Sequence, residues 1–446
     1  MSERGGQETN NSLSTRSRAW TWVPSLYFTE GIPFVVVMTV SVIMYKRLGI
    51  SNADIAFYTS WLYLPWVIKP LWSPLVDMLR TKRFWIIAMQ LLIGAGLGGV
   101  ALTLPGDNFF RVSLAIFWLV AFSSATHDIA ADGFYMLGLS QHEQTWFVGV
   151  RSTFYRLAMI VGQGILIMIA GALEGFYGGG ETVNIPVYQL QQAWAVTFYV
   201  LGFLFVILVI YHWLVLPRTE PVLQNKQLSI KQLSQEFILT FVTFFKKKHS
   251  VSILAFLLLY RFAEAQLAKI AAPFLLDTKA TGGLALSTGE VGFTYGTVGI
   301  VMLTLGGLLG GFLAAKHGLK YWLWWMVAAI NLPNAVYIFL AFVLPESRLL
   351  INVAVGVEQF GYGFGFTAYM LYMIYAADGE HKTAHFAICT GFMALGMMLP
   401  GMFSGQLQEY LGYQNFFLWV LVATIPSFYV ASKIQLDENF GKEAKS

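Results

Sequence analysis

The sequence predicts an all-α integral membrane protein with 12 transmembrane helices in two six-helix bundles and both termini in the cytoplasm. Three observations support this prediction: long apolar stretches, basic residues concentrated on one side, and a weak internal repeat. Hydrophobic residues make up 57% of the 446 residues and charged residues 12%, whereas ordinary soluble domains carry about 25% charged residues. The composition is therefore that of a protein that lies mostly in lipid.

A helix needs about 20 apolar residues to cross the hydrocarbon core of a bilayer. Prolines within such helices are expected to kink them, because neighbouring helices can satisfy the freed backbone groups. The chain contains suitable stretches at residues 22–45, 53–76, 84–104, 112–137, 146–171, 192–216, 251–275, 289–314, 321–344, 350–375, 384–408 and 413–432.

The basic residues indicate the orientation of these helices. Lys and Arg accumulate in the cytoplasmic loops of membrane proteins. They are abundant in the predicted loops on one side and few on the other, where they occur only at Lys46, Arg47, Arg111, Lys279 and Arg348. Both termini then lie in the cytoplasm, and this placement requires an even number of spans.

A single long polar linker at mid-chain separates two halves of similar length. Its segment Ile230 to Phe245 is amphipathic and is expected to lie on the inner membrane surface. We therefore expect a disordered cytoplasmic N-terminus at 1–19, a bundle at 20–216, the linker at 217–249, a second bundle at 250–433 and a cytoplasmic tail at 434–446.

The two halves also resemble each other in sequence. Lys82–Trp85 matches Leu319–Trp322 at an offset of 237, and Val150–Met159 runs alongside Ile388–Met397 at an offset of 238. Two nearly equal offsets favour a parallel repeat of six helices. The second half lacks the two arginines of the first-half segment, so the polar residues do not follow the repeat.

Charged residues within the apolar stretches are the main functional signal. A charge at the centre of a spanning helix costs about 2.5–3.5 kcal/mol on insertion scales, so such residues face one another or a hydrated cavity. A membrane protein with a charged, hydrated interior usually moves a solute or an ion. The residues concerned are Glu30, Lys69, Asp128, Asp132, Arg156, Arg261, Glu264, Lys269 and Glu358.

Five of these residues are acids that could carry a coupling proton. Asp128 and Asp132 lie one turn apart on a predicted helix, and their mutual repulsion favours the binding of a proton. The alternative is an ion pair that only locks two helices. Arg261 and Glu264, three residues apart, are expected to neutralise each other. The candidate proton carriers are Glu30, Asp128, Asp132, Glu264 and Glu358.

Other polar residues are candidates for substrate binding or for structural and gating roles. Arginine binds carboxylates bidentately, and tyrosine rings stack against sugars. The alternatives are pairing of Arg156 with Asp128 or Asp132, a hydrogen-bonded neighbour role for His127, and ordinary packing of the tyrosines. The substrate candidates are His127, Tyr155, Arg156, Arg261, Lys269, Tyr362 and Tyr369, and the structural or gating candidates are Lys69, Asp77 and Arg80.

Several functional classes lack their sequence signals. The chain has no phosphate-binding loop motif, no zinc-protease motif and no basic patch interleaved with aromatic residues for nucleic acid. Its single Cys389 excludes an internal disulfide and a multi-cysteine metal site. We expect no metal, no cofactor and no enzymatic activity, and a monomer whose partners are the bilayer, protons and a small-molecule substrate.

Several motifs resemble those of one transporter family. They are Glu30–Pro33, Lys69–Asp77, Ala121–Asp132, Tyr155–Leu157, Gly289–Gly292 and His385–Ala387. On these residues the chain resembles the AmpG-type muropeptide permeases, in the peptide–acetyl-coenzyme A transporter branch of the major facilitator superfamily. The resemblance implies a proton-driven importer of N-acetylglucosaminyl-anhydro-N-acetylmuramyl peptides across a bacterial inner membrane. It also implies that the first, fourth, seventh and tenth helices line the cavity.

The chain departs from this family at three single positions and in the turn after Asp77, where the arginine-rich sequence of the family is degraded. The family usually has Gln at the place of His127, Asp at that of Glu264 and Lys at that of Arg261. Alternative functions are therefore transport of another amphiphilic or anionic solute, such as a drug, a siderophore or an acetyl-CoA-like anion. A membrane enzyme that uses the acids catalytically and a sensor that does not transport are further alternatives.

Overall fold

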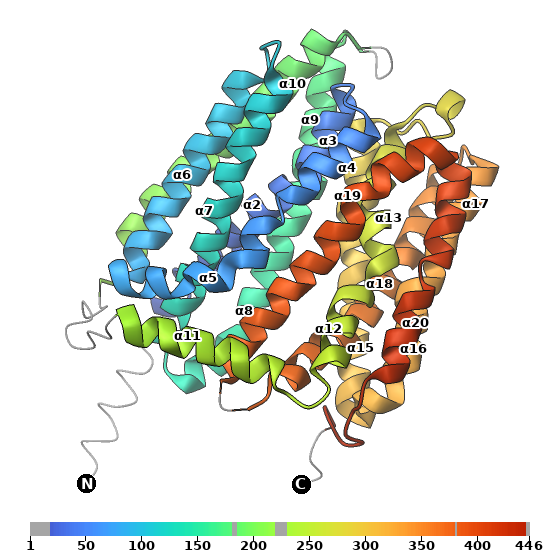
Figure 1. Ribbon diagram of the computed structural model, residues 1–446. Helices are drawn as coiled ribbons and strands as arrows, with labels where there is room; N and C mark the ends of the chain where they lie inside the picture. The colour runs from blue at the N-terminus through green and yellow to red at the C-terminus, as the bar shows by residue number, and fades with distance from the viewer. Residues whose placement is uncertain (1–17, 181–184, 219–229, 380, 443–446) are drawn as a thin grey trace, which may run out of the picture. The chain divides into compact units, whose positions relative to one another are not determined.

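The computed structural model describes residues 18–180, 185–218, 230–379 and 381–442, and all regular structure in these ranges is helical (Figure 1). In chain order the elements are α2 Val23–Val35, η1 Val36–Val40, α3 Ser41–Arg47, α4 Asn52–Trp61, α5 Leu64–Leu79, α6 Lys82–Thr103, α7 Phe109–Gly138, α8 Gln141–Ile160, η2 Val161–Ile165, α9 Leu166–Tyr177, α10 Val187–Val215, α11 Ile230–Phe245, α12 Ser250–Leu259, α13 Phe262–Leu276, η3 Lys279–Thr281, α14 Thr288–Val291, η4 Gly292–Gly299, α15 Ile300–His317, α16 Leu319–Asn331, η5 Leu332–Asn334, α17 Ala335–Val343, α18 Arg348–Ala377, α19 Lys382–Val422 and α20 Ile425–Lys433.

Nine helical stretches of the described chain are long and apolar enough to cross a membrane. Eight of them coincide with predicted spans, and the ninth, Lys382–Lys433, contains the last two predicted spans, with Gly412 in a non-helical conformation between them. The predicted span 53–76 corresponds to α4 and α5, which are separated at Leu62, and 350–375 corresponds to α18. The predicted number of 12 helices is not confirmed by this criterion.

The chain packs as two compact units. Unit 1 comprises the described residues of Met1–Val36, Trp72–Val161 and Ala195–Gln227, and unit 2 those of Val37–Leu71, Gly162–Trp194 and Leu228–Ser446. This division cuts through helices of the first half and does not follow the linker at 217–249. The organisation in two six-helix bundles therefore stays a prediction.

In unit 1, α2 packs against α7 and α8, and α6 packs against α7. The core contains Trp22 of the α2 entry and Phe134 of α7, whose rings meet edge to face at 5.0 Å. Gly31 of α2 allows the close approach of α8, because a Cβ atom there would lie 2.7 Å from the Ala158 Cβ atom. This close packing brings the polar residues of the three helices together.

In unit 2, α15 and α16 pack against α18, α13 and α4 pack against α19, and α9 packs against α14. The π-helical turn η2 joins α8 to α9, and the π-helical turn η4 joins α14 to α15. These two turns contact each other. A Cβ atom on Gly296 would lie 1.8 Å from the carbonyl oxygen of Gln163, so only glycine fits at this crossing. The contact joins a helix of the first half of the chain to one of the second.

The linker segment predicted to be amphipathic forms α11, which lies across the beginning of α19 (Figure 1). Thr243 shares a 3.1 Å hydrogen bond with His385, and Phe244 is buried in the core. Ile238 and Val242 are exposed on another part of the helix. The side chains of 230–237 and the residues 219–229 lie outside the described part, and the position of α11 on the membrane surface stays a prediction.

The predicted tail at 434–446 is docked where it is described. The Leu319 backbone N–H donates to the carbonyl oxygen of Phe440 at 3.0 Å, and the Phe440 ring meets Tyr375 of α18 edge to face at 4.8 Å. Lys320 pairs with Glu438 at 3.2 Å. The segment therefore ties the turn between α15 and α16 to α18, within unit 2.

Replacement of Gly318 by Ala is expected to loosen this docked segment. Gly318 adopts φ 87° and ψ 154°, and a Cβ atom there would lie 3.2 Å from the Glu438 carbonyl oxygen. This conformation is almost exclusive to glycine, and we expect a loss of about 1–3 kcal/mol, measured as a lower melting temperature in detergent. Gly311→Ala is the control, because Gly311 is helical and a Cβ atom there meets open space. Equal melting temperatures for the two variants would contradict the prediction.

Candidate functional site

Three carboxylates gather in unit 1. Oxygen atoms of Glu30 on α2 and of Asp128 and Asp132 on α7 all lie within 4.8 Å of one another. Glu30 is buried, and the two aspartates are half-buried. The spacing of the aspartates by one helical turn was evident in the sequence, whereas the approach of Glu30 depends on the packing of α2 against α7. The group can share a proton, and its geometry would also fit a cation.

Arg151 of α8 completes this cluster, and sequence reasoning did not select it. Its Nη2 atom lies 2.7 Å from Asp132 Oδ1, which also accepts a 3.0 Å hydrogen bond from the Tyr27 hydroxyl. The guanidinium stacks over the ring of Tyr27 at 4.3 Å and lies 5.2 Å from that of Tyr135. One sequence signal could have identified Arg151: the first half of the internal repeat has this arginine, and the second half has no arginine at the corresponding position.

Two predicted substrate residues lie on the same helix. The ring of Tyr155 packs beside Gly31, the neighbour of Glu30. A Cβ atom added to Gly31 would lie 3.5 Å from this ring. Arg156 follows it and is half-buried. Both therefore belong to unit 1, on the helix that carries Arg151.

His127 lies on a different face of α7 from the carboxylates. It is fully buried, and its Nε2 atom lies 2.9 Å from the Gln90 amide nitrogen. The Gln90 amide oxygen lies 2.9 Å from Nδ1 of His212, whose Nε2 atom is 3.0 Å from the Ser25 hydroxyl. This chain of hydrogen bonds ties α2, α6, α7 and α10 together. The alternative of a hydrogen-bonded neighbour therefore describes His127 in this structure.

Unit 2 contains a second set of buried charges, in which the hydrogen-bond partner of Arg261 is Tyr362 and not Glu264. Helix α12 ends at Leu259, and Arg261 adopts the non-helical φ −107° and ψ 22° before α13 begins. Arg261 consequently donates a hydrogen bond to the Tyr362 hydroxyl and lies over the Phe366 ring at 4.9 Å. In the described residues no ion pair joins it to Glu264, because the non-helical backbone angles of Arg261, the N-cap of α13, turn its side chain toward Tyr362 of α18.

Glu264 and Glu358 are the buried acids of this set. Their side chains are 4% and 2% exposed, and each has one carboxylate oxygen with no hydrogen-bond partner among the described residues. The other oxygen of Glu358 accepts a 2.9 Å hydrogen bond from Gln359. A buried carboxylate with an orphan oxygen costs free energy unless it is protonated or meets a ligand.

Lys269 is a buried cation of unit 2. Its Nζ atom donates to Thr59 Oγ1 at 2.8 Å and lies 5.3 Å from the centre of the Tyr63 ring. Both partners come from α4 and the break after it, so Lys269 joins a helix of the first half to α13 of the second. Tyr362, a further substrate candidate, accepts the hydrogen bond of Arg261.

Tyr369 does not share this setting. It is fully buried in the core, its hydroxyl donates to the Leu257 carbonyl oxygen at 2.6 Å, and its ring stacks on Tyr260 at 5.5 Å. The alternative of ordinary packing therefore describes Tyr369, and we no longer assign it to the substrate. The sequence places Tyr369 in the predicted span 350–375 but does not show which neighbour covers it.

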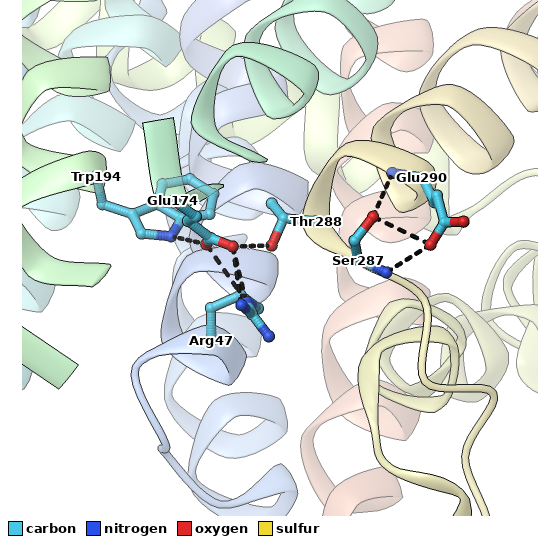
Figure 2. A network of polar contacts seen from close by, with 6 residues as sticks. All are labelled: Arg47, Glu174, Trp194, Ser287, Thr288 and Glu290. Carbon is cyan, nitrogen blue, oxygen red and sulfur yellow. Dashed lines mark hydrogen bonds and ion pairs between the residues drawn. The ribbon is translucent and has the colours of Figure 1, made fainter. Parts of the chain in front are cut away.

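A buried network joins the two halves of the chain within unit 2 (Figure 2). Glu174 of α9 accepts hydrogen bonds from Arg47 of α3 at 2.9 and 3.1 Å, from the Trp194 indole at 2.9 Å and from the Thr288 hydroxyl at 2.6 Å. The Glu174 side chain is 3% exposed. Thr288 begins α14 in the second half, so one carboxylate links four helices. All of these residues lie at ends predicted to face the outside.

A second polar group reinforces the same end. Lys46 of α3 pairs with Asp277 at 2.7 Å, and Asp277 also accepts a 2.5 Å hydrogen bond from the Tyr413 hydroxyl. Asn52 of α4 donates to Gln408 at 2.6 Å and to Tyr413 at 2.9 Å. We call the contacts of Glu174, Asp277 and Asn52 together the outer network. It holds α3, α4 and α9 against α13, α14 and α19.

The predicted structural and gating residues are less fully described. Lys69 is half-buried on α5. Arg80 is exposed after α5 and lies 5.7 Å from the Phe84 ring. The side chain of Asp77 lies outside the described part of the chain. Arg83 donates to the carbonyl oxygens of Leu216 and Trp213, so this basic loop caps the end of α10.

Comparisons with known proteins agree with this architecture. The family description "Major Facilitator Superfamily" matches residues 25–399. A Rickettsia conorii protein named as transporter AmpG 4 is 25% identical over 422 residues, which cover 91% of this chain and 94% of the relative. The anhydromuropeptide permease of Escherichia coli is 24% identical over 413 residues, covering 90% of this chain and 76% of the relative.

Solved structures share the fold at lower identity. A mutant form of the nucleoside transporter NupG has a TM-score of 0.69 at 15% identity, and covers 94% of this chain and 100% of its own. A D-xylose–proton symporter has a TM-score of 0.64 at 10% identity, and covers 96% of this chain and 99% of its own. The predicted all-α membrane fold class is thereby confirmed.

Proposed function

Because this chain belongs to the major facilitator superfamily, a superfamily of membrane transporters, we propose that it imports anhydro-muropeptides from cell-wall turnover, driven by protons. The chain is a multi-pass membrane transporter and not an enzyme, as its relatives are permeases. The AmpG-type names of relatives that align over about nine-tenths of the chain support the substrate and a place in a bacterial inner membrane.

The carboxylate cluster supports the proton coupling. Glu30, Asp128 and Asp132 lie within 4.8 Å of one another, and the guanidinium of Arg151 pairs with Asp132. Repulsion among three like charges in a low-dielectric region favours the binding of a proton by the group. Glu264 and Glu358, each with an orphan oxygen, are the second candidates for a proton.

The outer network supports a cycle of alternating access. It closes the outer ends of α3, α4 and α9 against α13, α14 and α19 within unit 2. We propose that these contacts break when substrate enters from outside and form again when it is released inward. Arg156, Arg261, Lys269, Tyr155 and Tyr362 are the proposed contacts of the glycopeptide, and Lys69, Asp77 and Arg80 the proposed gating residues.

Uptake into membrane vesicles tests this function. Vesicles that contain the protein should accumulate radiolabelled N-acetylglucosaminyl-anhydro-N-acetylmuramyl tripeptide under an imposed inward proton gradient. A protonophore should abolish the accumulation, and unlabelled substrate should compete. Accumulation no greater than in vesicles without the protein would reject the substrate. If siderophores, drugs or acetyl-CoA inhibit the proton-dependent uptake and unlabelled muropeptide does not, the protein transports another solute.

A further inference from the structure

Arg151 has the features of a ligand-binding residue. Its guanidinium carries five N–H donors, and among the described residues its hydrogen bonds go to Asp132 alone. Its side chain is 31% exposed and that of Asp132 is 37% exposed. A charged group on a membrane-spanning helix is tolerated at such exposure only if it faces water. Donors of Arg151 therefore point to a hydrated space.

The surroundings of Arg151 hold the guanidinium in a fixed orientation. The Tyr27 ring lies under it at 4.3 Å, and Asp132 and the Tyr27 hydroxyl are themselves joined at 3.0 Å. The hydroxyl of Tyr135, the second ring near the guanidinium, donates to the Gln144 carbonyl oxygen at 2.5 Å. Arginine stacked on an aromatic ring loses less freedom when it binds a planar anion bidentately.

The second half of the chain contains an internal comparison for this site. At the offsets of the repeat, Asp132 corresponds to Tyr369 and Arg151 to Cys389. Both second-half residues are completely buried in one apolar core cluster. The second half therefore packs at this place without charges. A charged pair is thus not a requirement of the fold at the equivalent place of the repeat, and the exposure of Arg151 and Asp132 leaves their pair open to a ligand.

From this geometry we propose that Arg151 binds a carboxylate of the transported substrate, with Tyr27 and Tyr135 as aromatic walls and Asp132 as the competing acceptor. The substrate carboxylate takes the donors of Arg151 that Asp132 leaves open, and it weakens the Arg151–Asp132 ion pair as it binds. This inference rests on the proposed transport of a carboxylate-bearing glycopeptide. It adds the residue that recognises the charge of that substrate.

Binding to the purified full-length protein tests the inference by calorimetry. The probes are the anhydro-muropeptide tripeptide and its counterpart with all carboxylates amidated. The wild-type protein should prefer the acid by at least about tenfold, as expected for a charge-assisted hydrogen bond. Arg151→Gln should bind both compounds equally, and Arg151→Lys should keep part of the preference. An undiminished preference in Arg151→Gln would overturn the proposal.

Two further variants separate ligand binding from a structural ion pair. Asp132→Asn removes the competing charge and should tighten binding of the acid, whereas loss of a purely structural pair would not. A double variant that exchanges the two charges, Arg151→Asp with Asp132→Arg, restores an ion pair. It should recover the melting temperature of the wild-type protein and still lack the preference for the muropeptide with free carboxylates. Recovery of that preference in the exchanged variant would also overturn the proposal.

Failure of the proposed function gives a different result. If the wild-type protein binds neither muropeptide, thermal shifts with citrate and phosphate are compared for the wild-type protein and Arg151→Gln. Stabilisation by citrate in the wild-type protein alone supports a carboxylate site, and equal shifts in both overturn it. Stabilisation only in phosphatidylglycerol-containing nanodiscs, lost in Arg151→Gln, assigns the site to a lipid head group and rejects the substrate role.

Discussion

Asp128→Asn is expected to abolish proton-driven accumulation of the substrate, with a loss of at least roughly 100-fold in the rate of uptake. Asparagine keeps the size and the hydrogen-bonding capacity of the side chain but cannot take up or release a proton. Asp128 lies in the group whose oxygens are within 4.8 Å of Glu30 and Asp132. Removal of one carboxylate from this group leaves only Glu30 and Asp132 and weakens the mutual repulsion on which the proposed proton binding depends.

The same variant should retain exchange of substrate down its own gradient. Counterflow requires that the loaded protein reorients, but it does not require net movement of protons. Vesicles preloaded with unlabelled substrate therefore distinguish a coupling defect from a folding defect. Asp107→Asn is the matched control, because Asp107 is exposed in the loop between α6 and α7. Uptake by Asp128→Asn at the wild-type rate would reject the role of Asp128.

Glu174→Gln is expected to open the outer network. The variant leaves Arg47 without its charged partner and places an amide donor beside the donors of Arg47, Trp194 and Thr288. Loss of one partner from a buried ion pair costs about 3–5 kcal/mol. Arg47 is 17% exposed, so we expect the lower end of this range. Hydrogen exchange should become at least about tenfold faster in peptides from α9 and α14, since each tenfold corresponds to about 1.4 kcal/mol.

Glu290→Gln is the control for this experiment. Glu290 lies two residues after Thr288 and forms a capping box with Ser287 at the start of α14 (Figure 2). It also pairs with Arg348 at 2.6 Å. Its side chain is 37% exposed, and exposed ion pairs contribute only about 0–1 kcal/mol. Exchange in α9 should therefore stay close to that of the wild-type protein. The same exchange rates in both variants would show that Glu174 does not hold the outer ends together.

The sequence predicted the positions of helices more reliably than their interruptions. Long apolar runs determined eight spans individually, because the need for about 20 apolar residues leaves a strong pattern. The break at Arg261 was not predicted, since Leu259 and Phe262 are as apolar as the rest of their stretch. That break decides that Arg261 meets Tyr362 and not Glu264. Two residues three positions apart pair along a helix only if both have helical backbone angles, since these angles set the direction of each side chain, and those of Arg261 are not helical.

The candidate site shows the same limit. The apolar pattern identified Glu30, Asp128 and Asp132 as groups that need polar surroundings, because lipid excludes charge wherever it occurs. Nothing local distinguished Arg151 from Arg156, or the buried His127 from a cavity residue. These distinctions depend on which helix faces which, and on whether a glycine such as Gly31 lets two helices approach.

By itself, the sequence determined that this protein is a helical membrane protein with ionisable residues in its interior. The length and polarity of its stretches are properties of the chain, and the bilayer acts on them directly. Only the tertiary structure decided which charges meet: Arg151 with Asp132, and Glu174 with Arg47, Trp194 and Thr288. Their partners come from helices far apart in the chain, and the packing of those helices depends on side-chain shapes that no local pattern records.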